Sequence, residues 1–472
     1  MPDGQKRVFV QTMGCQMNEH DTERILAKLV ALGYTPTERQ EEADLVFLNT
    51  CTVRDRSEQK VYSILGTFGE LKRRNPSVVV GVGGCVAQQQ GAALLARVPH
   101  LDLVLGTDAI DALPSLLARV RPAEGRAERA VSTRFRPTYP AEPDTQAYID
   151  HLVPRSGEGT GRVKAFVTIM RGCDHFCSFC IVPYVRGRER SRPAWDIVQE
   201  VEGLAARGIK EVTLLGQNVN SYGRKRGCGE TFVGLLERLD RVDGLERVRF
   251  TTSHPVDLSD GLIEAYGRLR TLCEHLHLPV QSGSARVLEA MRREYTLDRY
   301  LDVVRRLKAR VPELALTTDV IVGFPGETEA DFEATLALME EVGFADAFVF
   351  KYSPRPRTAA ARLPDQVPEP VKEARLARAL ALQGRLADAF RARQVGRTLE
   401  VLVEGRARKG DGLAGRTRTN LVVNFPGDPA LVGRLVPVHI TEALPHSLRG
   451  LPAGTGDGVS ACAGPATQAF VA

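Results

Sequence analysis

Short apolar runs alternate with amphipathic stretches over the first 120 residues of the chain. The apolar runs are typical of buried strands and cover residues 7–12, 44–50, 77–82 and 101–105. The stretches between them repeat apolar residues at helical spacing, over 19–32, 55–72 and 107–120. Strands that alternate with helices predict a parallel sheet, whose strands all end at one edge. We therefore expect an N-terminal α/β domain over residues 1–122.

The same alternation returns after residue 160 and predicts a second α/β domain. Strands are expected at 163–170, 211–215, 246–251, 274–280, 315–322 and 347–352. Helical spacing follows the strands, for example over 193–207 and 328–342. Six parallel strand–helix units fall short of the eight in a closed barrel of this type. We therefore expect an open, partial (β/α)6 barrel over residues 161–388, with a lateral gap that admits a large substrate.

After a helical stretch at 371–393, the pattern changes to that of short strands. Strands are expected at 399–403, 421–425 and 435–440, separated by glycine-rich turns. This spacing predicts a small β-barrel over residues 391–452. Basic residues lie between the strands, namely Arg406, Arg408, Lys409, Arg416 and Arg418. Basic barrels of this size commonly bind RNA, and a purely structural C-terminal cap is the alternative.

Two segments show neither the helical nor the strand spacing of apolar residues. Residues 123–160 are rich in Pro, Arg, Glu, Thr and Gly, which predicts a linker between the first two domains. Residues 453–472 are rich in Gly, Ala and Thr, which predicts a disordered tail.

The loop after the first predicted barrel strand holds Cys173, Cys177 and Cys180 at the spacing Cys-x3-Cys-x2-Cys. Thiolates are soft ligands that select zinc or iron–sulfur clusters, but a closed zinc site needs four ligands. No fourth cysteine lies nearby, and His175 is too close to its neighbours to be an easy ligand. A disulfide is disfavoured because the number of thiols is odd. A [4Fe–4S] cluster on three thiolates has one open iron, to which a small molecule can bind.

Each of the first three strands of the N-terminal domain is also followed by a cysteine. These are Cys15, Cys51 and Cys85, with glycines at 14, 83 and 84. A single cysteine of this kind is more often an inert, buried thiol. Three at equivalent strand ends favour a shared metal site, and the glycines let the backbone approach a bulky cluster.

Composition narrows the class of partner. The formal net charge is only +5, from 63 basic and 58 acidic residues, so any RNA contact should be local. One basic run lies near the barrel mouth and comprises Arg186, Arg188, Arg190 and Arg192, with Lys351 and Arg355. Such a run is usually solvated, and contacts phosphates if the substrate is RNA. With no apolar signal core, no membrane-length apolar run and nine cysteines, the chain is expected in the reducing cytoplasm.

These motifs resemble the radical S-adenosylmethionine methylthiotransferases. The resemblance rests on the segments 12–18, 49–54, 81–87, 171–180 and 415–420. The segment Gln16-Met17-Asn18 is most similar to members that act on isopentenylated adenosine in tRNA. Sister enzymes that act on threonylcarbamoyl-adenosine or on ribosomal protein S12 are one alternative. A non-catalytic, zinc-stabilised RNA-binding protein is the alternative from another class.

The resemblance implies two [4Fe–4S] clusters, one on Cys173, Cys177 and Cys180 and an auxiliary one on Cys15, Cys51 and Cys85. It also implies a C-terminal barrel of the TRAM type. The residues implied to bind S-adenosylmethionine are Phe179, Gly216, Gln217, Gln281, Ser282, Val322 and Gly323. No side chain is assigned a catalytic role. One departure is Arg357, which stands where the family pattern Tyr-Ser-x-Arg-x-Gly-Thr has glycine.

The activity implied by the resemblance needs two molecules of S-adenosylmethionine. One methylates a sulfur on the auxiliary cluster, and the other yields a radical that removes hydrogen from carbon 2 of N6-isopentenyladenosine at tRNA position 37. The methylthio group is then inserted at that carbon. The implied partners are tRNA, a reductant such as flavodoxin or ferredoxin, and a sulfur donor. We expect a monomer with no membrane association.

Overall fold

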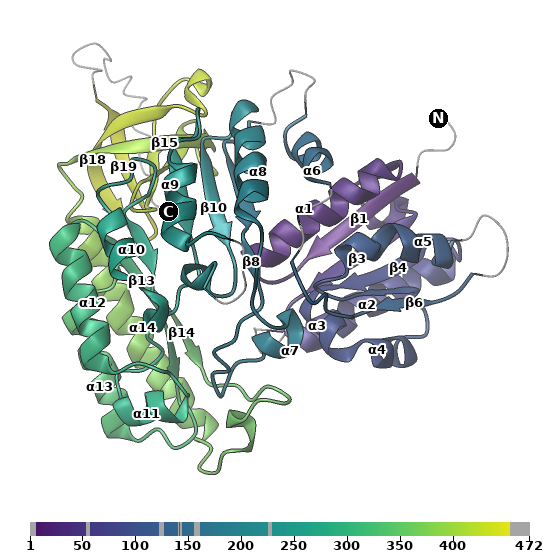
Figure 1. Cartoon of the computed structure of the whole chain (residues 1–472), viewed down its shortest axis with the longest axis horizontal. Helices are drawn as coiled ribbons and strands as arrows, with labels where there is room; N and C mark the ends of the chain where they lie inside the picture. Colours follow the sequence, from purple (N-terminus) through teal and green to yellow (C-terminus); the bar gives the residue numbers. More distant parts are fainter. Residues whose placement is uncertain are drawn as a thin grey trace, which may run out of the picture. The chain divides into compact units, whose positions relative to one another are not determined.

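The computed structural model of the protein describes residues 6–52, 57–121, 127–139, 141, 144–154, 161–224 and 229–453. The chain divides into two compact units, Met1–Ala387 and Asp388–Ala472. The first unit contains two regions in which parallel strands alternate with helices, and the second contains a small barrel (Figure 1). In the parts of the chain that are described, every helix is too short or too polar to cross a bilayer.

The N-terminal sheet has six parallel strands in the order β2-β1-β3-β4-β5-β6. Its strands are β1 (Lys6–Thr12), β2 (Tyr34–Pro36), β3 (Leu45–Thr50), β4 (Val79–Gly83), β5 (Leu103–Leu105) and β6 (Ala130–Ser132). Its helices are α1 (Gln16–Ala31), α2 (Ser57–Arg74), α3 (Gly84–Gln90), α4 (Ala92–Arg97) and α5 (Leu113–Val120). Phe47 joins one apolar cluster while Val46 and Leu48 join another. Helices therefore cover both faces of the sheet, and the predicted α/β layer is confirmed.

The predicted linker over 123–160 is corrected where the structure describes it. Residues 130–132 form β6, which pairs with β5 in parallel and adds an edge to the sheet. Thr145–Leu152 form helix α6, which buries Tyr148, Ile149 and Leu152 in the barrel core. A three-residue strand is too short to show a period, and a helix of only eight residues is easily missed. Residues 122–126, 140, 142–143 and 155–160 lie outside the described part, as does the predicted tail from 454 onward.

The second domain has six parallel strands in two three-stranded sheets. The strands are β7 (Lys164–Thr168), β10 (Glu211–Leu215), β11 (Arg247–Phe250), β12 (His275–His277), β13 (Ala315–Val322) and β14 (Asp346–Lys351). A bridge between Val248 and Leu272 joins the two sheets. Within the described residues no ladder joins β14 to β7, so the predicted open barrel is confirmed.

Helices lie outside these strands (Figure 1). They are α8 (Ala194–Ala206), α9 (Phe232–Leu239), α10 (Asp260–Ala265), α11 (Ala285–Ala290), α12 (Leu297–Arg310), α13 (Glu329–Val342) and α14 (Glu369–Ala392). Helix α13 begins with a reciprocal capping box between Thr328 and Asp331. It ends at Gly343, whose φ of +62° suits glycine.

Beyond β14 the chain makes the turn in which Arg357 replaces a family glycine. Arg357 adopts a φ of +70° and is exposed. The backbone nitrogen and hydroxyl of Thr358 both donate to the carbonyl of Arg355, at 3.2 and 2.7 Å. The turn is therefore formed despite the substitution, with a non-glycine residue in the left-handed region.

The second unit is a closed five-stranded barrel, ordered β15-β16-β17-β19-β18. Its strands are β15 (Thr398–Arg406), β16 (Leu413–Thr417), β17 (Val422–Phe425), β18 (Leu435–Leu444) and β19 (Ser447–Pro452). The sequence predicted the barrel and three of these strands but missed β16 and β19, whose apolar residues are sparse. At Gly415 any side chain would clash with the carbonyl of Leu402 on the neighbouring strand. The basic Arg416 is paired with Glu404 at 3.2 Å.

Candidate functional site

Cys15, Cys51 and Cys85 come together at one edge of the N-terminal sheet. Each follows a strand, and β1, β3 and β4 are direct neighbours in the sheet. Cys51 and Cys85 are buried, whereas Cys15 is exposed. The thiols of Cys15 and Cys51 both act electrostatically on Cys85, so the three sulfurs are close. The arrangement provides three soft ligands with one side open to solvent.

Glycines make room at this edge. Gly14 has a φ of +123°, and a Cβ there would lie 2.7 Å from Cys51 Cβ and 3.1 Å from its sulfur. Gly84 has a φ of +88°, and a Cβ there would clash with the backbone of Thr50. No other residue fits at these two positions, which agrees with a bulky cluster held on the three thiols.

Buried polar side chains tie the three cysteine loops together. Asn18 donates to the carbonyl of Thr50 at 2.8 Å, and Asn49 donates to the carbonyl of Asn18 at 2.9 Å. The hydroxyl of Thr50 accepts from the backbone of Val86 at 3.1 Å. These motif residues therefore hold the loops in place, while Val53 and Arg54 of the same motif lie outside the described residues.

The second thiol set lies on the loop after β8 (Met170–Arg171), which pairs with β9 (Arg190–Ser191). At Gly172, φ is +80°, and a side chain would clash with the carbonyl of Arg188. Ser178 donates from its backbone to Met291 at 2.9 Å and from its hydroxyl to Ala290 at 2.8 Å. The loop that carries Cys173, Cys177 and Cys180 is thus anchored on both sides.

Burial disfavours the thiolate form that a metal needs. It raises the pKa of Cys85 to about 11 and those of Cys173 and Cys180 to about 12. Each set has one buried arginine that offsets this effect. Arg293 lies 3.5 Å from the sulfur of Cys177, and the positive charge of Arg186 acts to lower the pKa of Cys85. Arg293 was not predicted, because its only distinguishing feature in the sequence is that it follows another arginine, Arg292.

The predicted solvated arginine run is wrong for three of its four members. Arg186 pairs with Asp21 at 2.7 Å, and Arg190 pairs with Asp108 at 2.8 Å. Arg192 pairs with Glu200 at 2.7 Å, and all three arginines are buried. Such buried pairs cannot contact RNA phosphates. Their partners Asp21 and Asp108 lie in the N-terminal domain, so no local pattern could reveal them.

Arg188, the fourth arginine of the run, and Lys351 are also paired. Arg188 is exposed and lies 2.7 Å from Asp174, and the partly exposed Lys351 lies 3.3 Å from Glu373. Ion pairs that water can reach are weak, so these side chains can exchange partners.

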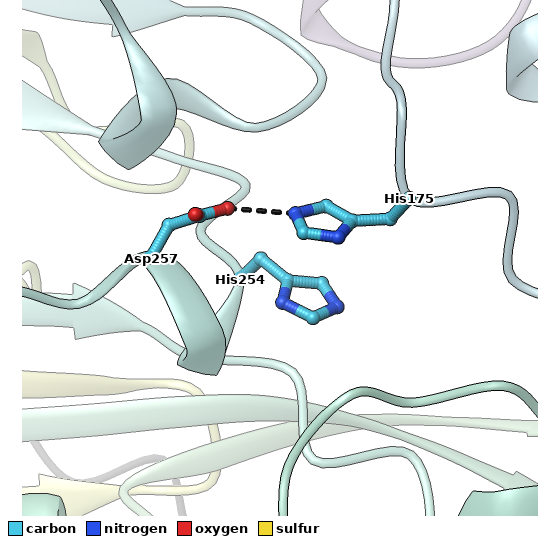
Figure 2. A group of neighbouring side chains, drawn as sticks. All are labelled: His175, His254 and Asp257. Carbon is cyan, nitrogen blue, oxygen red and sulfur yellow. Dashed lines mark hydrogen bonds and ion pairs between the residues drawn. The ribbon is translucent and has the colours of Figure 1, made fainter. Parts of the chain in front are cut away.

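A buried polar group fixes the segment between Cys173 and Cys177. The Nε2 atom of His175 lies 2.6 Å from Asp257, and Nδ1 lies 3.1 Å from Glu294. The His175 and His254 rings stack with centroids 3.8 Å apart and planes 11° apart. Figure 2 shows the two rings with Asp257 beside His175. The lone pairs of two stacked, nearly parallel rings lie in separate parallel planes, so in this arrangement the two imidazoles do not both point at one metal ion. The group positions the loop.

Asp257 is the centre of this group. Burial alone would raise the pKa of Asp257, but hydrogen bonds from His175 and Asn218 outweigh it and lower that pKa. The amide of Asn218 donates to Asp257 at 2.6 Å. The carboxylate therefore connects the ends of β10 and β11 to the cysteine loop.

A cavity of about 370 Å³ opens beside Cys180. The predicted residues Phe179 and Gln281 line it, together with Asp319, Ile321 and Tyr352, which the sequence analysis did not assign. Gln281 has a φ of +71°, and its buried Oε1 has no partner in the described part of the chain. Strain and an unsatisfied polar atom at a cavity wall are typical of a ligand site.

The other predicted cofactor residues lie outside that lining. Gln217 accepts a hydrogen bond from the backbone of Gly172 at 2.6 Å, which places it beside the cysteine loop. Ser282 lies 3.3 Å from Thr335, and the backbone of Gly323 donates to Glu327 at 2.6 Å. Val322 is fully buried, and Gly216 packs against Met170 too closely for a side chain. The structure thus gathers Phe179, Gln281 and Gln217 around the loop, while the other four predicted residues do not line the cavity.

Three families match the chain over separate ranges. "Uncharacterized protein family UPF0004" matches residues 7–106, "Radical SAM superfamily" residues 167–339 and "TRAM domain" residues 392–452. A tRNA-2-methylthio-N(6)-dimethylallyladenosine synthase of Geotalea uraniireducens (strain Rf4) is 50% identical over 446 residues, covering 94% of this chain and 98% of the relative. The synthase of the same name from Geobacter metallireducens is 51% identical over 447 residues, covering 95% and 98%.

Solved structures resemble the fold at low identity. A radical S-adenosylmethionine methyltransferase, TsrM from Kitasatospora setae, has a TM-score of 0.56 at 15% identity, covering 76% of this chain and 75% of that chain. The cobalamin-dependent S-adenosylmethionine radical enzyme OxsB has a TM-score of 0.50 at 12% identity, covering 80% and 56%. Both likenesses concern the fold alone.

Proposed function

This chain belongs to the family of the tRNA-2-methylthio-N6-dimethylallyladenosine synthases, and we propose that it inserts a methylthio group at carbon 2 of N6-isopentenyladenosine in tRNA. We assign the modified nucleoside to position 37, beside the anticodon. The enzyme uses S-adenosylmethionine and [4Fe–4S] clusters, as a radical S-adenosylmethionine enzyme does.

The observation that carries this proposal is that two incomplete thiol sets adjoin each other. Cys85 of the first set packs against Ile181, which directly follows Cys180 of the second set, and against Val185 of the next helix. Three thiolates leave one corner of a cubane cluster without a protein ligand. Sulfur insertion into an unreactive aryl C–H needs a sulfur carrier beside a radical source, and two adjoining open sites meet that need.

We assign one cluster to Cys173, Cys177 and Cys180 and the auxiliary cluster to Cys15, Cys51 and Cys85. When bound, these groups and S-adenosylmethionine supply the electron, methyl and hydrogen-abstraction chemistry that no side chain provides. The protein's own residues bind and orient. Arg293 and Arg186 stabilise ligand thiolates, and the His175–Asp257 pair holds the loop.

The cavity beside Cys180 supports a cofactor site for S-adenosylmethionine. Phe179 and Tyr352 line it with apolar surface that excludes water, and the free Oε1 of Gln281 offers an acceptor. We propose that Gly216, Gln217, Ser282, Val322 and Gly323 shape the walls around this cavity. Of these, Gln217 orients the loop through its bond to Gly172.

The proposed partners follow from the reaction. We propose that tRNA binds the second unit, whose basic residues at 406, 408 and 409 are exposed. A one-electron reductant such as flavodoxin or ferredoxin would supply the electron, and a separate sulfur donor would restore the auxiliary site. We further propose a monomer that works in the cytoplasm, where tRNA is modified.

Mass spectrometry of tRNA nucleosides from a deletion strain tests the substrate. We expect the methylthio-isopentenyl nucleoside to disappear, N6-isopentenyladenosine to accumulate, and the wild-type gene to restore the product. Persistence of the methylthio nucleoside in the deletion strain would overturn the proposal. Loss of methylthiolation from threonylcarbamoyl-adenosine or from ribosomal protein S12 would instead indicate a sister enzyme.

Metal analysis of anaerobically purified protein tests the two-cluster assignment independently. Two [4Fe–4S] clusters correspond to about eight irons per chain with equal labile sulfide. Stoichiometric zinc without sulfide would contradict the assignment.

A further inference from the structure

Arg186 connects the two thiol sets through the interior of the first unit. It is the last residue of α7 (Val182–Arg186), the helix that follows Cys180. Its guanidinium donates to Asp21 on α1 at 2.7 Å, and both side chains are buried. Arg186 thus lies on the loop of one set and contacts the domain that carries the other.

The remaining face of this guanidinium is directed at the auxiliary thiols. Val185, the residue before Arg186, packs against Cys85, and negative charge on Cys85 or Cys15 raises the pKa of the Arg186 guanidinium. Its buried Nη2 atom has no hydrogen-bond partner, sulfur included, among the described residues. A sulfur of a cluster bound at this edge would give this donor the acceptor that it lacks.

Asp21 is shared between two arginines. Arg171 lies 3.6 Å from its second oxygen, so two buried guanidiniums face one carboxylate. A buried positive charge beside a cluster ligand favours the more reduced, more negative state of the cluster.

We propose that Arg186 is a positioning residue of the auxiliary site, which holds Cys85 through α7 and raises the reduction potential of the cluster bound there. This inference rests on the proposed function, because it requires a cluster on Cys15, Cys51 and Cys85. In this proposal helix α7 sets the distance between the two thiol sets, and its last residue, Arg186, supplies one positive charge to the auxiliary site.

Full-length protein that carries Cys173→Ala, Cys177→Ala and Cys180→Ala isolates the auxiliary cluster for measurement. In this background we compare Arg186, Arg186→Lys, Arg186→Gln and the double variant Asp21→Asn/Arg186→Gln. Each protein is reconstituted anaerobically and assayed for iron and sulfide. An EPR-monitored redox titration then gives the midpoint potential, and thermal unfolding of the reconstituted protein reports its stability.

At the midpoint potential of the Arg186 protein, we expect Arg186→Gln to lower the ratio of reduced to oxidised cluster at least tenfold. A tenfold change in this ratio corresponds to a shift of 59 mV in the midpoint potential of a one-electron couple. Arg186→Lys keeps the charge and should lie closer to the Arg186 protein. The double variant should regain part of the stability that Arg186→Gln loses, because the buried charge that lost its closer guanidinium is also removed, but keep the lowered potential.

A double variant that returns to the original potential would overturn the inference, since the effect would then come from the unpaired Asp21. An unchanged potential in Arg186→Gln would overturn it as well. If Arg186→Gln retains no cluster, iron in the double variant decides: continued loss supports the inference and full recovery overturns it. Absence of a cluster in the protein with Arg186 intact would instead contradict the proposed auxiliary site.

Discussion

The imidazole of His175 and the carboxylate of Asp257 lie 2.6 Å apart, and both side chains are buried. His175 belongs to the cysteine loop, whereas Asp257 follows the strand β11, so the pair fastens the loop to the barrel. In Asp257→Ala, the side chains of His175 and Asn218 lose an acceptor inside the protein. We expect the free energy of unfolding to fall by about 2–3 kcal/mol, the cost of a lost buried, charged hydrogen bond.

Iron assays should show weaker retention on the Cys173 set in this variant. The matched control is Asp260→Ala, since Asp260 is mostly exposed in its pair with Arg306. Urea unfolding of both variants checks the expectation, and equal stability of the two would show that the pair is not structural.

The buried arginines predict a second contrast. Arg192 pairs with Glu200 at 2.7 Å with both side chains fully buried, whereas Arg188 is exposed. Replacing Arg192 with Met removes the closer guanidinium partner of buried Glu200 and a donor to buried Asp196, and leaves Arg24 3.8 Å from Glu200. We expect a loss of about 3–5 kcal/mol. Arg188→Met should leave thermal unfolding unchanged. A small effect of Arg192→Met would show that Arg24 alone compensates the charge of Glu200.

The turn at Arg357 predicts a stabilising substitution. A non-glycine residue in the left-handed region costs about 1–2 kcal/mol, and the greater freedom of glycine in the unfolded chain offsets about 0.4–1 kcal/mol of that. Arg357→Gly should therefore stabilise the protein by roughly 0.5–1 kcal/mol. Arg357→Ala, which keeps the strain, is the control. Chemical denaturation that ranks alanine above glycine would contradict this account of the turn.

The two thiol sets predict separable defects. Cys177→Ala should abolish reductive cleavage of S-adenosylmethionine, because it removes a ligand of the cluster assigned to that cofactor. Cys51→Ala should leave cleavage measurable but stop sulfur insertion. Cys273→Ala is the matched control, as that buried cysteine belongs to neither set. Assays of 5′-deoxyadenosine and of methylthiolated product distinguish the variants, and equal loss of both in Cys51→Ala would argue against separate roles.

The capping box of α13 predicts a pH dependence. Burial opposes the charge of Asp331, but hydrogen bonds from Ser284 and Thr328 outweigh it and hold the pKa of Asp331 well below its usual range. A depressed folded-state pKa gives stability that is complete above the unfolded value near 4 and is lost as pH falls further. Asp331→Asn should cost about 1 kcal/mol at pH 7, as the loss of a helix cap does. Unfolding of the cluster-free protein at pH 7 and pH 3 should show this difference shrinking with acid.

Periodicity was sufficient for most of the architecture. The six barrel strands lie within a residue or two of the predicted ranges, apart from β12, which is shorter. Strands and helices depend on contacts within a few positions, which a linear pattern records. Short elements were missed, since β6 has three residues and α6 contributes only two turns to the core.

The sequence alone therefore determined the six cysteines and the strand ends on which they lie, because a cysteine directly after a parallel strand must emerge at the sheet's carboxyl edge. Only the tertiary structure decided which charges are buried. Arg186 and Arg190 find Asp21 and Asp108 across the interface between two layers of the first unit, 165 and 82 positions away in sequence. Local pattern encodes period, whereas the environment of a charge depends on whatever distant segment packs against it.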